Sequence, residues 1–506
     1  MQAARFRAIR LNGMIGISQS SEKRAIIDIG SNTVRLVVYN GPPRAPVVIL
    51  NEKVNARLGR DLGKTGAINE KSMKTALVAL ARFSGLLRLL DVRDVECVAT
   101  AAARDASNGK VFLDAVRQFG LSPRLLSGEE EARASATGVI AAFPGAQGVA
   151  ADLGGGSLEL VEIADGRSTG GITLPLGTLL LPDLRAAGEA KFSETVKKGL
   201  DRAGWDRGRG QPLYIVGGSW RALALQAMRA LDFPVDDPHG FELPASEAMR
   251  LARIFARGKL NNVDPRISTS RLASLPDAAA LMVEVIARLK PSKLVFSSWG
   301  LREGLLHAQL PAEIQAQDPM LASVAGFSAS ARVTAEDAMA LARWTAPVCR
   351  EEPQDRQLRQ ASGLLALAAM RTEPNLRTEE AMTWALRKRW IGLDMHGRGM
   401  MAMTVFANSG QTEVPEQFTR LASQEDLDRA IGWGLAVRLC RRLTGCSATG
   451  LARTSIRSED GKLVLALDAS MRPLYSPGVA KDHKALADWL GLECEVRDSS
   501  GLALVD

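Results

Sequence analysis

Two short glycine-containing turns, each following an apolar run that ends in an aspartate, constrain this sequence more than any other feature. The first lies in RAIIDIGSNTVRLVVYN, at residues 24–40, and the second in VAADLGGGSLELVE, at residues 149–162. Asp152 follows Asp28 by 124 positions, so the same Asp-x-Gly core occurs twice. One such turn is typical of a β-hairpin, whereas two similar turns indicate a duplicated structural device.

The small residues of both turns suit them to bind phosphate. Without bulky side chains, successive backbone N–H groups can converge on the phosphate oxygens, and the aspartate at the head of each turn could hold a hydrated Mg²⁺. Two tight hairpins without a ligand are the alternative interpretation, and neither turn is a Walker loop because G-x-x-x-x-G-K-[ST] is absent. The candidate phosphate-binding residues of the turns are Gly30, Ser31, Asn32, Thr33, Gly154, Gly155, Gly156 and Ser157.

The rest of the sequence predicts two α/β lobes followed by two further domains. β-type and helical runs alternate as far as about residue 312, which is typical of an α/β fold. Helical periodicity with little β signal then follows, and the chain closes with a hairpin at Asp460-Gly461, a helix and a strand. We expect a flexible leader at 1–22, a first lobe at 23–138, a second lobe at 139–312, an all-α domain at 313–445 and a small α+β domain at 446–506.

The charge of the chain favours an anionic partner other than a nucleic acid. A formal net charge of +8 attracts polyanions, although an arginine-rich proteome would produce the same value. Aromatic residues make up only 5%, without the basic-aromatic interleaving of single-strand binders. No apolar run approaches the roughly 20 residues of a membrane span, and the five cysteines lack metal-ligand spacing. We expect a cytoplasmic protein with no membrane span and no nucleic-acid partner.

The sequence resembles the exopolyphosphatase and guanosine pentaphosphate phosphohydrolase (Ppx/GppA) family in seven motifs that occur in family order: DIGSNTVRL, EKVNARLG, ATAAARDASNG, SGEEEAR, DLGGGSLEL, VGGS and GLREGLL. The resemblance covers residues 24–308 and implies two duplicated ribonuclease-H-like lobes of the actin, Hsp70 and sugar-kinase superfold. Beyond residue 315, the likeness to the long family members implies a degenerate HD-like domain, a small last domain and a homodimer.

The motif SGEEEAR contains the expected general base. Ser127 to Glu130 form a capping box, and acids in a first helical turn are favoured by the helix dipole. This structural interpretation explains Glu130 but leaves Glu131 without a task. The resemblance implies that Glu131 is the base that orients the attacking water.

The other expected site residues come from the neighbouring motifs. By strand alternation Glu159 falls on the face of Ser157, so its carboxylate could reach the same water or ion; a solvent-exposed strand acid is the alternative. Arg104 is either a surface arginine or, by resemblance, a bidentate phosphate clamp. The expected catalytic residues are Glu131, Glu159 and Asp152, the expected ligands of Mg²⁺ or Mn²⁺ are Asp152, Asp28 and Glu159, and the further phosphate-binding residues are Arg104, Gly217 and Gly218.

Two segments depart from the family pattern. The third glycine turn reads YIVGGSW, where relatives have a sequence closer to Gly-Thr-Gly-Gly-Thr, and STSRLASLPDAAAL keeps Asp277 but lacks the usual Glu-Arg-Ala-Asp run. These departures concern contacts to a distal group, such as a nucleoside, more than the chemistry. The four histidines form no His-Asp doublet, so the all-α domain is not expected to be a second catalytic centre; they are His239, His307, His396 and His483.

The expected function is Mg²⁺-dependent, processive removal of the terminal phosphate from inorganic polyphosphate. The sister activity, removal of the 5′-γ-phosphate of guanosine pentaphosphate (pppGpp), shares the same motifs and is the nearest alternative, with pppGpp or ppGpp then as a partner. An ATP-dependent kinase of the same superfold and a non-catalytic sensor of polyphosphate or alarmone are more distant alternatives.

Overall fold

The computed structural model describes residues 23–258, 260, 262–329, 331 and 333–498. The chain divides into two compact units between Pro319 and Met320. The leader predicted at residues 1–22 lies outside the described residues. The predicted division into four folded domains is finer than these two units and stays a prediction.

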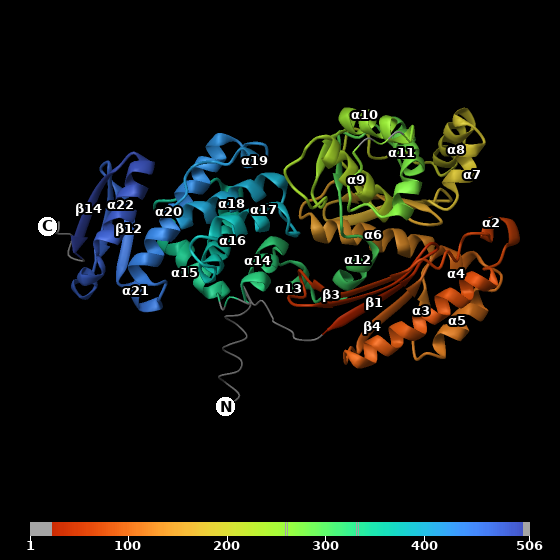
Figure 1. Ribbon diagram of the computed structural model, residues 1–506, viewed down its shortest axis with the longest axis horizontal. Helices are drawn as coiled ribbons and strands as arrows, with labels where there is room; N and C mark the ends of the chain where they lie inside the picture. The colour runs from red at the N-terminus through yellow and green to blue at the C-terminus, as the bar shows by residue number, and fades with distance from the viewer. Residues whose placement is uncertain (1–22, 259, 261, 330, 332, 499–506) are drawn as a thin grey trace. The chain divides into compact units, whose positions relative to one another are not determined.

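The first sheet has the strand order β3-β2-β1-β4-β5, with β1 (Arg24–Ile29), β2 (Val34–Asn40), β3 (Val47–Val54), β4 (Asp94–Ala99) and β5 (Pro123–Leu125). Helices α3 (Glu70–Leu89) and α5 (Gly109–Arg117) lie side by side along this sheet in Figure 1. Phe83 of α3 and Phe112 of α5 belong to the same core as Ile27 and Ile29 of β1. Ile26 belongs to a second core. Burial on both faces explains why β1 is a continuous apolar run up to its aspartate. Two short helices, α2 (Leu62–Thr65) and α4 (Ala101–Asp105), complete this lobe.

The second sheet repeats the connectivity of the first. Its order is β10-β11-β9-β6-β7-β8, with β6 (Gly148–Leu153), β7 (Leu158–Ala164), β8 (Arg167–Leu174), β9 (Leu213–Val216), β10 (Glu242–Pro244) and β11 (Lys293–Phe296). β6 pairs antiparallel with β7 and parallel with β9, just as β1 pairs with β2 and β4. The second sheet adds only β10 at its edge. The duplicated α/β lobes expected from the sequence are therefore present.

Helix α6 (Gly128–Ala142) lies between the two sheets. Ala132 and Ala136 belong to the core of the second sheet, whereas Ala134 packs against residues of the first sheet and of α12 (Leu301–Ala308). Small residues permit this close approach, since a Cβ atom on Gly304 would lie 1.8 Å from the carbonyl oxygen of Ala134. The first turn of α6 is thus fixed between both lobes. The remaining helices of the second lobe are α7 (Leu181–Ala186), α8 (Glu189–Arg202), α9 (Gly218–Ala230), α10 (Ala245–Ala256), α11 (Thr269–Leu289) and α13 (Ala312–Gln315).

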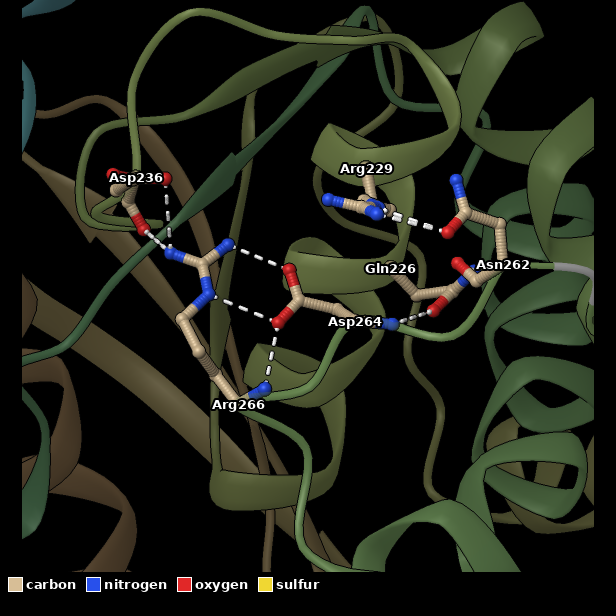
Figure 2. Close-up of polar contacts among 6 residues, drawn as sticks. All are labelled: Gln226, Arg229, Asp236, Asn262, Asp264 and Arg266. Carbon is tan, nitrogen blue, oxygen red and sulfur yellow. Dashed lines mark hydrogen bonds and ion pairs between the residues drawn. The ribbon is translucent and has the colours of Figure 1, made fainter.

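A polar network holds the segment that leads into α11 against α9. Figure 2 shows the Arg266 guanidinium between Asp264 and Asp236, and its Nη2 donates to Asp264 Oδ2 at 2.6 Å. The Asp264 amide donates to Gln226 Oε1 of α9 at 3.1 Å, and Arg229 of α9 donates to the side chain of the nearby Asn262. Asp264 is buried and forms charge-assisted hydrogen bonds, which are the strong class. The start of α11 therefore has a firm anchor.

The second compact unit consists of helices followed by a three-stranded sheet. The helices are α14 (Pro319–Ala329), α15 (Ala335–Thr345), α16 (Arg356–Ala368), α17 (Arg377–Leu386), α18 (Met395–Ser409), α19 (Glu416–Thr419), α20 (Gln424–Thr444) and α21 (Ala448–Ala452). The described part of residues 313–445 contains no strand, while the likeness to an HD-like domain stays a prediction. Figure 1 colours this unit from green to blue.

The three-stranded sheet has the order β12-β13-β14, with β12 (Thr454–Glu459), β13 (Lys462–Leu467), β14 (Glu493–Asp498) and the helix α22 (Pro477–Leu490). Asp460 and Gly461 join β12 to β13 with φ values of 50° and 74°. Such φ values at both central residues are typical of a two-residue hairpin turn. None of the described helices is long and apolar enough to cross a membrane.

Candidate active site

Both Asp-x-Gly turns line one cavity of about 650 Å³ in the first compact unit. The predicted catalytic and metal-binding residues all line it, as do the predicted glycine-turn residues. Arg104 does not contribute to the lining and lies behind Glu131, as described below. The predicted set is therefore brought together from both lobes, and its roles stay proposals.

The two turns have the same backbone geometry and touch one another. The Gly30 amide donates to Thr33 O at 3.0 Å, and the Gly154 amide donates to Ser157 O at 2.9 Å. A Cβ atom on Gly155 would lie 2.8 Å from the backbone nitrogen of Asn32. Only a glycine permits this approach without a shift of the neighbouring turn.

In each lobe, the loop that follows β3 or β8 donates backbone hydrogen bonds to carbonyl oxygens of the glycine turn. Asn32 O accepts from the Arg57 amide at 2.9 Å, and Gly155 O accepts from the Leu179 amide at 3.0 Å. Within the described residues, no protein acceptor pairs with the amides of Ser31, Asn32, Gly155 and Gly156. Unpaired amides on a cavity wall are the donors that a phosphate group requires.

The aspartate of each turn begins a row of residues that lie directly opposite one another on adjacent strands. In the first sheet Asp28 pairs with Arg35, and Arg35 pairs with Lys53. In the second sheet Asp152 pairs with Glu159. Paired residues on adjacent strands share a face of the sheet, and these five side chains all line the cavity.

Glu131 occupies the first turn of α6, next to Arg104. Arg104 Nη1 lies 3.5 Å from Glu131 Oε2 and donates to Leu126 O at 3.0 Å. Burial, together with repulsion by Asp152 and Asp28, raises the pKa of Glu131 to about 7 against the opposing effect of Arg104. A carboxyl group with a pKa near neutrality can accept a proton from water without being mostly protonated beforehand.

The two aspartates have different partners. Ser135 of α6 donates to Asp152 Oδ2 at 2.5 Å, whereas Arg302 Nε of α12 lies 3.8 Å from Asp28 Oδ2. Burial raises the pKa of both carboxyl groups. Burial also raises the pKa of Glu159 well above its usual value, with repulsion by Glu131 as the next cause. The cavity therefore concentrates negative charge that a cation would stabilise.

These carboxylates have the chemistry to hold Mg²⁺. No group of three or more His, Cys, Asp or Glu side chains among the described residues is arranged as a complete metal site. Mg²⁺, however, usually takes only one or two carboxylates and completes its shell with water and phosphate oxygens. Glu159 Oε1 is buried without a hydrogen-bond partner. Asp152, with Glu159 and Asp28 nearby, is thus a suitable donor set.

Several residues of the cavity were not predicted. Arg302 and Glu303 belong to GLREGLL, a motif recognised in the sequence without a role for its charges. Glu303 is buried, accepts from the Tyr39 hydroxyl at 2.8 Å, and raises the pKa of Arg302. The alternation of β2 could have placed Arg35 on the cavity face, since it is seven residues after Asp28 as Glu159 is after Asp152. No sequence signal identifies Arg271, which also lines the cavity.

Comparison with known proteins gives a family match. The model of the Ppx/GppA phosphatase family matches residues 37–313. Retrograde regulation protein 2 of Saccharomyces cerevisiae is 27% identical over 334 residues, which are 58% of this chain and 57% of that protein. The chain thus spans just over half the length of this curated relative.

A solved exopolyphosphatase structure has the same fold. An exopolyphosphatase from Cytophaga hutchinsonii superimposes with a TM-score of 0.50 at 22% identity, over 57% of this chain and 97% of that one. A Ppx/GppA family member from Aquifex aeolicus gives a TM-score of 0.49 at 24% identity, over 56% of this chain and 96% of that one. Since the family match covers more than half of the chain, this protein belongs to the Ppx/GppA phosphatase family, with its actin-like α/β fold.

Proposed function

We propose that this protein is a Mg²⁺-dependent exopolyphosphatase that removes the terminal phosphate of inorganic polyphosphate by hydrolysis. The observation that carries the proposal is that two glycine turns with unpaired amides open onto the same cavity as a carboxyl group whose pKa is about 7. Membership of the Ppx/GppA phosphatase family supports it.

In this mechanism the terminal phosphate lies between the two turns, where the amides of residues 31–32 and 155–156 donate to its oxygens. Glu131 accepts a proton from a water molecule, the water oxygen forms a bond to phosphorus, and the bridging P–O bond breaks. The electron pair of that bond leaves with the shortened polyphosphate. This leaving group is already a weak base, so the reaction needs no strong general acid.

The neighbouring charged residues have supporting roles. Arg104 holds the Glu131 carboxylate, and Ser135 fixes the orientation of Asp152. Asp152, with Asp28 and Glu159, would hold the Mg²⁺, which neutralises charge on the phosphoryl oxygens. Arg302 lines the cavity close to Asp28 and adds fixed positive charge, which stabilises the transferring phosphoryl group.

Hydrolysis of the γ-phosphate of guanosine pentaphosphate is the second candidate. The cavity volume of about 650 Å³ favours it, because sites that enclose a whole small molecule measure about 300–1,000 Å³. The motifs discussed above are common to both activities. A direct comparison of the two substrates must therefore decide.

The test is phosphate release by the full chain with Mg²⁺ from long-chain polyphosphate, guanosine pentaphosphate and ATP. Glu131→Gln should reduce kcat by about 10²–10⁴-fold, the range for loss of a general base. Glu129→Gln is the matched control, because Glu129 lies in the same helical turn but is exposed and pairs with Arg133. It should retain activity within about twofold.

Each result selects one function. Release from polyphosphate that is lost in Glu131→Gln and kept in Glu129→Gln supports the proposal, and faster release from guanosine pentaphosphate replaces it with the second candidate. Transfer of the ATP γ-phosphate to an acceptor would identify a kinase. Tight binding of polyphosphate without release of phosphate would identify a sensor.

A further inference from the structure

Two cysteines of the second compact unit lie together at the end of α20, and the proposed hydrolysis uses neither of them. Cys440 belongs to α20 and is fully buried, whereas Cys446 follows the end of this helix and is half-buried. The Cys440 thiol donates a hydrogen bond to the Cys446 sulfur. The two sulfur atoms are therefore in contact.

A sharp turn of the backbone holds the two cysteines next to one another. Thr444 Oγ1 lies 3.8 Å from Cys440 Sγ and accepts a hydrogen bond from the Cys446 amide at 3.0 Å. Gly445 and Cys446 have φ values of 59° and 55°, which is left-handed backbone and uncommon for a residue other than glycine. Such conformations cost energy and cluster at functional sites. The turn thus places Cys446 beside Cys440 despite this cost.

The two thiols differ in their readiness to lose a proton. The hydrogen bond from Cys440 lowers the pKa of Cys446, and the Arg441 guanidinium acts in the same direction, against partial burial and the Asp337 carboxylate. Burial raises the pKa of Cys440 well above its usual value. The thiolate is the nucleophilic form of cysteine, so Cys446 should react first.

We propose that Cys446 and Cys440 form a redox modification site, in which a peroxide oxidises Cys446 and Cys440 then closes a reversible disulfide. A thiolate beside a second, resolving cysteine is the usual arrangement of peroxide-sensitive sites. The disulfide would tie α20 to the residue before Ser447, the N-cap of α21. It would thereby fix the path of the chain from the helices to the three-stranded sheet. This inference does not depend on the proposed function.

The oxidation balances with hydrogen peroxide as the oxidant. The Cys446 thiolate attacks one peroxide oxygen, the O–O bond breaks, and hydroxide leaves and takes up the proton that the thiol released. The Cys440 sulfur then attacks the sulfenic acid of Cys446, the S–S bond forms and the S–O bond breaks. The departing hydroxide leaves as water with the Cys440 proton. Two thiols are oxidised, and one peroxide is reduced to two water molecules.

The test treats the reduced full-length protein with hydrogen peroxide, blocks the remaining thiols and maps tryptic peptides by mass spectrometry. Trypsin cleaves after Arg441 and Arg442, so a disulfide between Cys440 and Cys446 joins two peptides that separate on reduction. We expect this joined pair in the wild-type protein. Cys494→Ser is the matched control, because Cys494 is the exposed thiol, and this variant should form the same pair.

Two variants test the order of the steps. In Cys440→Ala the sulfenic acid of Cys446 has no resolving thiol, so dimedone should trap it. The same variant should slow alkylation of Cys446 by iodoacetamide at about pH 7 by about threefold or more, because the thiolate loses its hydrogen bond. A merely structural effect would loosen the turn and make this alkylation faster. In Cys446→Ser, Cys440 should remain unmodified.

The wild-type map decides the proposal even where a variant fails to fold. The proposal is overturned if peroxide leaves Cys440 and Cys446 unlinked, or if it oxidises Cys494 before Cys446. An equal yield of the linked pair in guanidinium chloride would also overturn it, because the folded turn would then not direct the reaction. A linked pair that forms in the folded protein, separates with dithiothreitol and is lost in guanidinium chloride supports it.

Discussion

The two lobes share one topology but place different chemistry along equivalent rows of residues. In the first sheet the row is Asp28, Arg35 and Lys53. In the second sheet the residues at the same register are Asp152, Glu159 and Thr173. Cations therefore follow the first aspartate, whereas an acid and a hydroxyl follow the second.

This difference shows what a duplicated fold leaves free to vary. Both copies keep the glycine turn, because its backbone amides and close packing allow little change. The residue opposite the aspartate is not needed for the turn, so one copy can hold the substrate and the other can act on it. We infer a division of work in which the first row supplies binding charge and the second row supplies the acids of the reaction.

The largest effect should come from the second row, in Glu159→Gln. We expect kcat to fall by about 10²-fold or more, because Glu159 belongs to the proposed donor set for the Mg²⁺ that would stabilise the phosphoryl charge. Thermal unfolding should show no loss of stability, because a buried carboxylate without a partner for Oε1 is costly to the folded state. Unchanged kcat would contradict the assignment of the acids to the second row.

In the first row, Arg35→Gln should have a smaller effect on catalysis, and it should change KM rather than kcat. We expect KM for polyphosphate to rise about tenfold through loss of one charged contact, with kcat within about threefold of wild type. Steady-state kinetics on both variants gives the comparison directly. A larger loss in kcat than in KM would make Arg35 part of the reaction and remove the proposed division between rows.

The sequence was sufficient for features that depend on local patterns. Strands β1 and β6 each end one residue after the aspartate that closes the apolar run, and Ser127 with Glu130 forms the predicted capping box. Recurrence of Asp-x-Gly predicted the two lobes. All of these depend on residues that are close in the chain, where spacing fixes geometry.

Contacts between segments that are distant in the chain could not be predicted from local sequence patterns. Arg271 and Lys53 line the same cavity only because the lobes face each other, and Ser135 reaches Asp152 because α6 lies between the sheets. The structure adds contacts of Arg104 with Asp105 and Glu131 that were not predicted, and its role as a phosphate clamp stays a prediction. The spacing of these residues in the sequence does not predict that they lie close together in the fold.

The pH dependence of kcat/KM tests Lys53 of the first row, and the expected change is smaller than that for Arg35→Gln. Burial and the surrounding arginines lower the pKa of Lys53 to about 8, so the ammonium loses its proton as pH rises through that value. Arg35, Arg221 and Arg271 are the charged groups that face it, and arginines keep their charge in this range. Glu131, with its pKa of about 7, titrates in wild type and in Lys53→Arg alike. Relative to Lys53→Arg, we therefore expect kcat/KM for tripolyphosphate to fall about fivefold between about pH 7 and about pH 9.

Lys53→Arg is the control for this profile, since the substituted side chain does not titrate there. Its profile should lack the fall near pH 8, while any titration of the substrate itself appears in both proteins. An identical fall in both would assign the effect to another group and leave Lys53 without a role in binding.

The smallest effect should come from the end of the second row. Thr173 has the register position that Lys53 has in the first sheet, but it is exposed, does not line the cavity and contacts the N-terminus of α6 at Gly128. Thr173→Val should therefore change kcat and KM by less than about twofold, as for most exposed substitutions. A tenfold fall in kcat/KM would mean that Thr173 contributes to the site. The two rows would then extend equally far into the site and differ only in charge.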